Sequence, residues 1–211
     1  MKKHVYSRAV NKQEGQLAVN LAEILVSAGL VVGAAFQAQV FFQDYQFESY
    51  YDELKSVETA LWDYKGVTGR WPGDCDADGV IDIGMDNKVS SKSEKAQCAF
   101  SVDSDEAIMS VLTDLASANM LDDDLRDKFA GNDGSRMQVS HDALHEAHVQ
   151  NVIVAFDVPV DLARWLDDKI DGEEAVNQGR IRLWANEKVQ EWPSSKETIE
   201  VNIAYYFDSK I

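Results

Sequence analysis

The sequence predicts an α+β protein in which one long N-terminal helix packs on a small antiparallel β-sheet head with a second helix and loops. Two observations carry this prediction. An apolar run, Leu21–Phe42, continues without a break into apolar residues at helical spacing. The C-terminal part then contains short β-rich runs separated by turn residues. With 211 residues, 45% of them hydrophobic, the chain can build a proper core and is not fully disordered.

The long helix is expected over residues 19–65, after a leader at residues 1–18. Its first half is apolar nearly all round, and its 22-residue run is long enough to span a bilayer. Its second half is amphipathic, with an apolar stripe made of Phe47, Tyr51, Leu54, Val57, Leu61 and Tyr64. Gly66, Gly69 and Pro72-Gly73 are the first strong helix breakers. The first half therefore needs lipid or other copies of itself around it, and the second half needs a globular domain.

The head domain is expected over residues 66–211. Apolar residues at helical spacing favour helices at 101–121 and Asp161–Ile170, and Gly172 ends the second of these. β-branched and aromatic residues favour three strands, at Asn151–Val158, Gly179–Ala185 and Ile199–Phe207. Residues 122–150 are polar and predict no definite element.

Charge is spread unevenly along the chain. The net charge is −17, yet residues 1–18 hold four basic residues against one acid. A short basic segment before an apolar run is typical of a targeting segment that faces the cytoplasm. The acidic remainder has no basic stripe and would repel phosphate, so no nucleic-acid partner is expected.

Residues 74–82 match the first half of an EF-hand-type calcium loop. Oxygen-bearing side chains stand at the first, third, fifth and ninth positions, and Gly79 stands at the sixth, where the chain must bend. The twelfth position is Met85 instead of Glu, with Glu94 and Asp103 as other candidates for the last ligand. The alternative interpretation is an acidic solvated turn. The predicted calcium ligands are Asp74, Asp76, Asp78, Val80 through its carbonyl, Asp82 and Asp86.

Two further sets of residues are candidate sites. Cys75 and Cys98 are the only cysteines, and they fit one disulfide in an oxidising compartment, the alternative being two unrelated buried thiols. His141, His145 and His148 are spaced by four and three, which places them near one face of a helix. That spacing suits zinc or copper only weakly, and a solvated helix is the simpler interpretation.

With its basic leader followed by VNLAEILVSAGLVVGAAF, the chain resembles the type IV pilin superfamily, which includes the type II secretion pseudopilins. Glu23 then corresponds to the glutamate that is fifth in the mature chain. The resemblance implies cleavage between Ala18 and Val19, although the family usually has Gly before the cut and Gly15 marks an alternative. ALWDYKGVTGRWPGDCDADGVID and LDDKIDGEEAVNQGRIRLW also resemble segments of one branch of pilin-like proteins.

The resemblance implies a structural filament subunit and not an enzyme. It implies an inner-membrane precursor, held in lipid, that a prepilin peptidase trims and that is methylated on Val19. An assembly platform and a cytoplasmic ATPase machine would then polymerise it with identical or homologous subunits into an extracellular filament at the cell surface. Glu23 would pair with the N-terminal amine of a neighbouring subunit, because each charge alone is costly in an apolar core. The alternatives are a type II secretion pseudopilin in the periplasm and a non-polymerising, membrane-anchored calcium-binding module.

Overall fold

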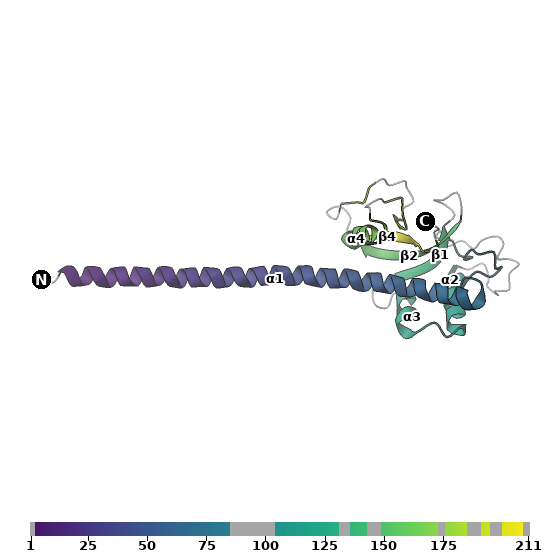
Figure 1. The fold of residues 1–211 in the computed structure, drawn as a ribbon, viewed down its shortest axis with the longest axis horizontal. Coiled ribbons are helices and arrows are strands. Elements are labelled where there is room, and N and C mark those ends of the chain that lie inside the picture. The colour runs from purple at the N-terminus through teal and green to yellow at the C-terminus, as the bar shows by residue number, and fades with distance from the viewer. Residues whose placement is uncertain are drawn as a thin grey trace. The chain divides into compact units, whose positions relative to one another are not determined.

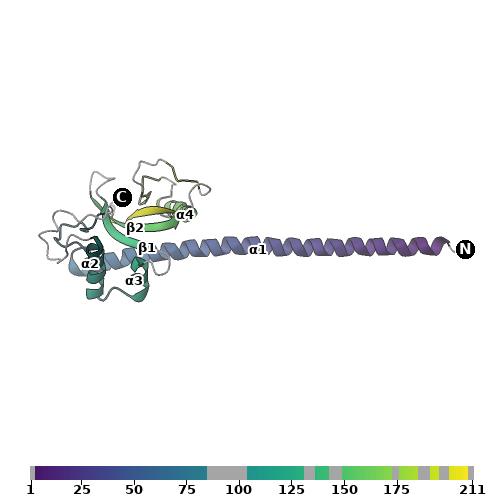
Figure 2. The ribbon, with the colours of Figure 1, turned by 180° about the vertical axis from the view of Figure 1, so that it is seen from behind.

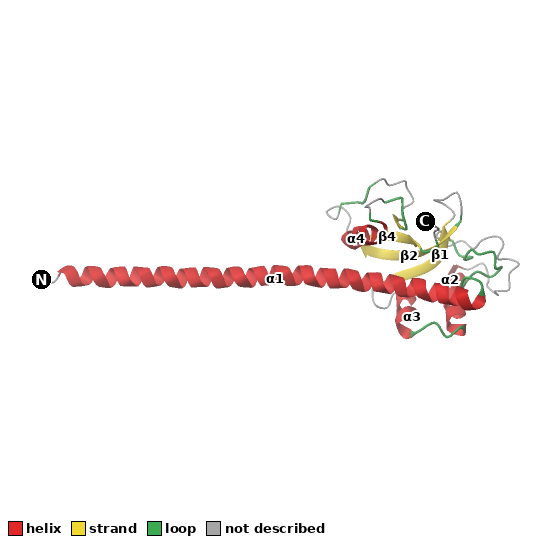
Figure 3. Cartoon of the chain, viewed as in Figure 1, coloured by secondary structure: helices red, strands yellow, loops and turns green. Residues whose placement is uncertain are grey.

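The computed structural model describes residues 3–84, 104–130, 136–142, 149–172, 176–184, 191–194 and 200–208, with the side chains of α1 described at Val26 and from Gly29 onward. These residues form an α+β protein, as the sequence predicts (Figure 1). The chain divides into two compact units, Met1–Ser49 and Tyr50–Ile211. The elements in chain order are α1 (Lys3–Thr68), α2 (Ser104–Ser117), α3 (Asp123–Ala130), β1 (Arg136–Asp142), β2 (Gln150–Pro159), α4 (Val160–Asp171), β3 (Ile181–Leu183) and β4 (Glu200–Tyr206), shown by type in Figure 3.

The unit Met1–Ser49 is the N-terminal part of α1. The helix already begins at Lys3, so the backbone of the predicted leader is helical as well. Nine large apolar side chains of this unit are 54% to 81% exposed: Val26, Leu30, Val31, Val32, Phe36, Val40, Phe41, Phe42 and Tyr45.

α1 covers the residues of the expected membrane-spanning first half, but among the described residues no helix combines the length and the apolar character needed to cross a membrane. The side chains of Ala18, Val19 and Glu23 lie outside the described residues.

In the unit Tyr50–Ile211, the rest of α1 packs on the sheet. Leu54, Val57, Leu61 and Tyr64 are at most 4% exposed, which confirms this part of the predicted apolar stripe. The views from front and back both show this part of α1 alongside the strands (Figure 2). Glu58, one turn beyond Leu54, is also buried and contacts β4, as described below.

The sheet has four antiparallel strands in the order β1-β2-β4-β3. Tyr205 of β4 pairs with Ile153 of β2 on one side and with Ile181 of β3 on the other, and all three are fully buried. A second buried cluster, with Phe156 and Trp184 packed against it, consists of Val152, Val154, Ala204 and Tyr206. Both faces of the sheet are therefore covered in its central strands.

Most predicted elements of the head are present, and two were not predicted. β2, β4, α2 and α4 lie where the sequence places them, and Gly172 ends α4 in a left-handed conformation with its N–H donating to Asp168 O at 3.0 Å. β3 is shorter than expected. α3 and β1 both fall within residues 122–150, where the sequence predicts no definite element.

Candidate cation site in the Asp74 loop

The loop at residues 74–82, called the Asp74 loop below, follows the end of α1. Gly69 has a φ of 81° and its N–H donates to Lys65 O at 2.8 Å, which closes the last turn of the helix. Within the loop, Ala77 and Gly79 have φ values of 56° and 93°. The bend that the sequence pattern assigns to Gly79 is therefore present, in a conformation that glycine adopts without strain.

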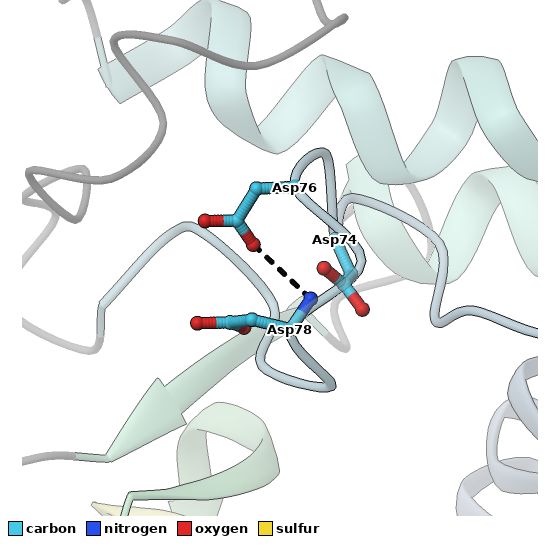
Figure 4. A group of neighbouring side chains, drawn as sticks. All are labelled: Asp74, Asp76 and Asp78. Atoms are coloured by element: carbon cyan, nitrogen blue, oxygen red, sulfur yellow. Dashed lines mark hydrogen bonds between the residues drawn. The ribbon is translucent and has the colours of Figure 1, made fainter.

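Three carboxylates come together on this loop. Asp74, Asp76 and Asp78 each offer one oxygen, and these oxygens all lie within 4.8 Å of one another (Figure 4). Asp76 Oδ1 accepts a hydrogen bond from Asp78 N at 3.2 Å, and Asp78 Oδ1 accepts one from Val80 N at 3.0 Å. These bonds hold the alternate side chains around one centre, as the spacing predicts.

Asp74 is the buried member of the group. Its residue is 0% exposed, Oδ2 accepts a hydrogen bond from Gly79 N at 3.0 Å, and Oδ1 accepts none from any described residue. Burial raises the pKa of Asp74, the Gly79 N–H lowers it in part, and the nearby charges of Asp78, Asp82 and Asp76 raise it further. A cation at this oxygen would remove both the desolvation cost and the repulsion.

Asp82, predicted as a ligand, makes a hydrogen bond with the backbone of the loop. It is only 3% exposed, and its Oδ2 accepts a hydrogen bond from Cys75 N at 2.8 Å. Asp82 N also donates to Gly73 O at 3.0 Å. Asp82 therefore ties the end of the loop to its start, and it is not a member of the three-carboxylate group. Asp86, the last predicted ligand, lies outside the described residues.

Strands β1 and β2 hold the loop from one side. Asn151 Oδ1 accepts from Ile81 N at 2.8 Å, and Asn151 Nδ2 donates both to Gly79 O at 3.0 Å and to Asp208 Oδ2 at 2.8 Å. His141 Nδ1 lies 2.6 Å from Ile81 O. Sequence reasoning missed Asn151, because an asparagine that opens a β-rich run carries no sign of its long-range partner.

Arg70 and α2 hold the loop from another side. The Arg70 guanidinium binds Asp114 through two bonds, Nη1 to Oδ2 at 2.9 Å and Nη2 to Oδ1 at 3.1 Å. Arg70 Nη1 also donates to Asp74 O at 2.9 Å, and Gly73 N donates to Asp114 Oδ2 at 2.9 Å. Because paired charges and two backbone groups meet here, the entry to the loop is fixed in one geometry.

The sequence predicts that the three histidines lie on one face of a helix, and for His141 this prediction is wrong. That residue lies in strand β1, paired with Asn151, and its ring faces the loop backbone. His145 and His148 lie outside the described residues. Cys75 is buried at 8% exposure, while Cys98 lies outside the described residues, so their disulfide stays a prediction.

Comparisons with known proteins do not identify a relative. No family model matches the chain, and neither a curated protein nor a solved structure matches it. The chemistry of the Asp74 loop therefore follows from its own residues. Three carboxylates are hard oxygen donors, which suit Ca²⁺ or Mg²⁺ better than metals that prefer nitrogen or sulfur.

Proposed function

We propose that the chain is the structural subunit of a type IV pilus-like filament, made from an inner-membrane precursor that a prepilin peptidase cleaves. The observation that carries this proposal is the set of nine exposed apolar side chains between Val26 and Tyr45. Burying one large apolar side chain contributes about 1.5–3 kcal/mol. A helix that leaves nine of them in solvent in a single chain calls for an apolar environment, either lipid or other copies of the helix.

The same helix supports the proposal further along the chain. From Tyr50 onward, α1 belongs to the compact head unit, where Leu54, Val57 and Leu61 are buried. In this proposal, the part of α1 before Tyr50 provides the association surface, and the part from Tyr50 onward belongs to the head. Association of this surface with a different surface of the next copy is heterologous, and a heterologous contact whose rotation does not close a ring yields an open filament.

Glu23 supplies the register in this proposal. A carboxylate within the apolar part of the helix is costly alone, and it is stabilised by the N-terminal ammonium of a neighbouring subunit. Subunits that stack in another register leave both charges unpaired. The pairing therefore favours one axial arrangement of the helices.

The test replaces Glu23 with alanine and leaves the remainder of the chain unchanged. We expect Glu23→Ala to accumulate in the membrane fraction and to yield no filaments in sheared surface material, as judged by electron microscopy and immunoblotting. Asp44→Ala is the matched control, because Asp44 is an exposed acid of the same helix, and it should yield normal filaments. Normal filaments from Glu23→Ala would contradict the role of Glu23.

The Asp74 loop favours a second candidate function, a membrane-anchored cation-binding module that acts alone. Three carboxylates with oxygens within 4.8 Å of one another support cation binding whether or not the chain polymerises. Recovery of fibres containing this chain separates the two, because a solitary module forms none. Fibres confined to the periplasm would instead indicate a type II secretion pseudopilin.

A further inference from the structure

We propose that the Asp74 loop is a calcium site whose protein ligands are the carboxylates of Asp74, Asp76 and Asp78. Asp82 is a positioning residue of this site and not a ligand. The site is independent of filament formation, so either proposal can fail without the other.

The buried carboxylate of Asp74 is what distinguishes this loop from an ordinary acidic turn. Acidic clusters on a surface are common and remain solvated. Here Asp74 is fully buried, and its Oδ1 receives no hydrogen bond from the described residues, although Oδ2 is bound by Gly79 N. A buried oxygen without a donor costs free energy, and a cation next to Asp76 and Asp78 satisfies it.

The donor set selects the class of cation. All three ligands are carboxylates, and Ca²⁺ accepts six to eight oxygen ligands in an irregular arrangement. Asp76 and Asp78 are accessible to solvent, so water completes the coordination on the outer side. Mg²⁺ needs a near-ideal octahedron, gives up its water reluctantly and is usually bound through one or two carboxylates, so a set of three carboxylates favours Ca²⁺. We expect an affinity on the order of 10⁻⁴–10⁻³ M, as in extracellular calcium modules.

Asp82 acts through the shape of the loop. Its Oδ2 accepts the N–H of Cys75, which lies directly between Asp74 and Asp76 in the chain. This bond turns the start of the loop so that the side chains on either side of Cys75 can meet. The amide oxygen of asparagine can accept the same bond, while asparagine carries no charge for a cation. Asp82→Asn therefore separates positioning from ligation.

The experiment measures calcium binding by the full chain in detergent micelles, after removal of bound cations with a chelator. Isothermal titration with CaCl₂ is compared for the wild type, Asp76→Asn, Asp78→Asn and Asp82→Asn. We expect the first two variants to lose affinity by about tenfold or more, because each loses a charged ligand. Asp82→Asn should stay within about threefold of the wild type, since the bond to Cys75 N is kept. Asp52→Asn, which removes an exposed acid of α1, is the matched control and should bind as the wild type does.

Each result decides the proposal. A wild-type chain that binds no Ca²⁺ up to about 10 mM, well above the expected range, overturns the site. Binding that survives both Asp76→Asn and Asp78→Asn overturns the ligand assignment. A loss in Asp82→Asn as large as that in Asp76→Asn makes Asp82 a ligand and overturns its positioning role. Melting temperatures measured in chelator for every variant show whether a loss of binding is a loss of folding. If the variants are unfolded, the test is the rise in the melting temperature of the wild type with CaCl₂ compared with the rise with MgCl₂. Equal rises with the two cations contradict the proposal.

Discussion

The carboxylate of Glu58 joins α1 to the sheet, and replacing it with glutamine tests that role. Its Oε1 accepts from Arg180 Nη2 at 2.9 Å, its Oε2 accepts from Tyr205 OH at 2.7 Å, and Lys55 binds Oε2 as well. Glu58→Gln keeps the size of the side chain but turns an N–H₂ group toward donors. At least one donor therefore loses its partner, and Lys55 and Arg180 lose their counter-charge.

The burial of these groups sets the expected magnitude. The Glu58 side chain is 10% exposed and that of Arg180 is 20% exposed, whereas that of Lys55 is 37% exposed. Removing one partner of a fully buried ion pair costs about 3–5 kcal/mol, and solvent at Lys55 reduces this. We expect Glu58→Gln to lower the free energy of unfolding by about 2–3 kcal/mol at pH 7. For a unit of this size, that is a drop of about 5–10 °C in melting temperature.

The pH dependence gives a second, independent signature. Burial raises the pKa of Glu58, but the hydrogen bonds from Lys55 and Tyr205 and the charges of Lys55 and Arg180 outweigh it, and the pKa lies below its ordinary value of 4.5. Because the folded pKa is lowered, the stabilisation is fully present above the unfolded pKa and is lost as the pH falls through the folded value. The difference between wild type and Glu58→Gln should therefore be constant above about pH 6 and shrink below about pH 4.5.

The assay is thermal unfolding of the full chain, followed by calorimetry across this pH range. Glu200→Gln is the matched control: Glu200 is exposed at the start of β4, and its substitution should change the free energy of unfolding by no more than about 0.5 kcal/mol. A Glu58→Gln variant as stable as the control at pH 7 would refute the reasoning. So would a difference that persists unchanged at pH 3.

Two further predictions concern the surroundings of the Asp74 loop. Gly73 has a φ of 77°, and a Cβ there would lie 2.8 Å from Val111 Cγ2, so Gly73→Ala should destabilise the head by about 2 kcal/mol or more in chemical denaturation. Gly66→Ala, with nothing within 4 Å of the added Cβ in α1, should leave stability unchanged or raise it by up to about 1 kcal/mol; equal effects of the two substitutions would contradict the steric argument. Burial raises the pKa of Asp208, and the bonds from Asn151 offset this only in part, so its contribution to stability grows as the pH falls through the folded pKa. The stability of the wild type relative to Asp208→Asn should therefore rise between pH 7 and pH 4, and a flat difference would count against a buried charge there.

The fold was predictable wherever local pattern decides structure. β2 and β4 are rich in β-branched and aromatic residues, and α4 ends at a glycine with positive φ, so these elements were placed correctly. β1 was missed because Gln138, Ser140 and Asp142 make its sequence look solvated, although all three are buried. Tyr206 OH donates to Asp142 Oδ2 at 2.5 Å, and Gln138 Nε2 donates to Ser140 Oγ at 3.0 Å. The first of these partners is distant in sequence, and no local pattern reveals it.

In the candidate site, too, some features could be predicted from local spacing and others could not. Alternation along the loop predicted that Asp74, Asp76 and Asp78 would meet, because the spacing of neighbouring residues determines it. Sequence spacing predicts Asp82 as a ligand, but it does not reveal that Cys75 N donates to Asp82 Oδ2. The histidine spacing suggested a helical face, whereas His141 lies in β1, which pairs with β2.

The short outer strand β3 affects how this chain can associate. At one end of the sheet order stands Ile181–Leu183, only three residues long, and Arg182 in its middle has its guanidinium 4.2 Å from the Tyr206 ring centroid. A short edge strand that carries a charged side chain offers few backbone groups with which a strand of another chain can pair. Addition of a foreign strand at this edge is therefore disfavoured, which protects that side of the sheet against amyloid-like growth.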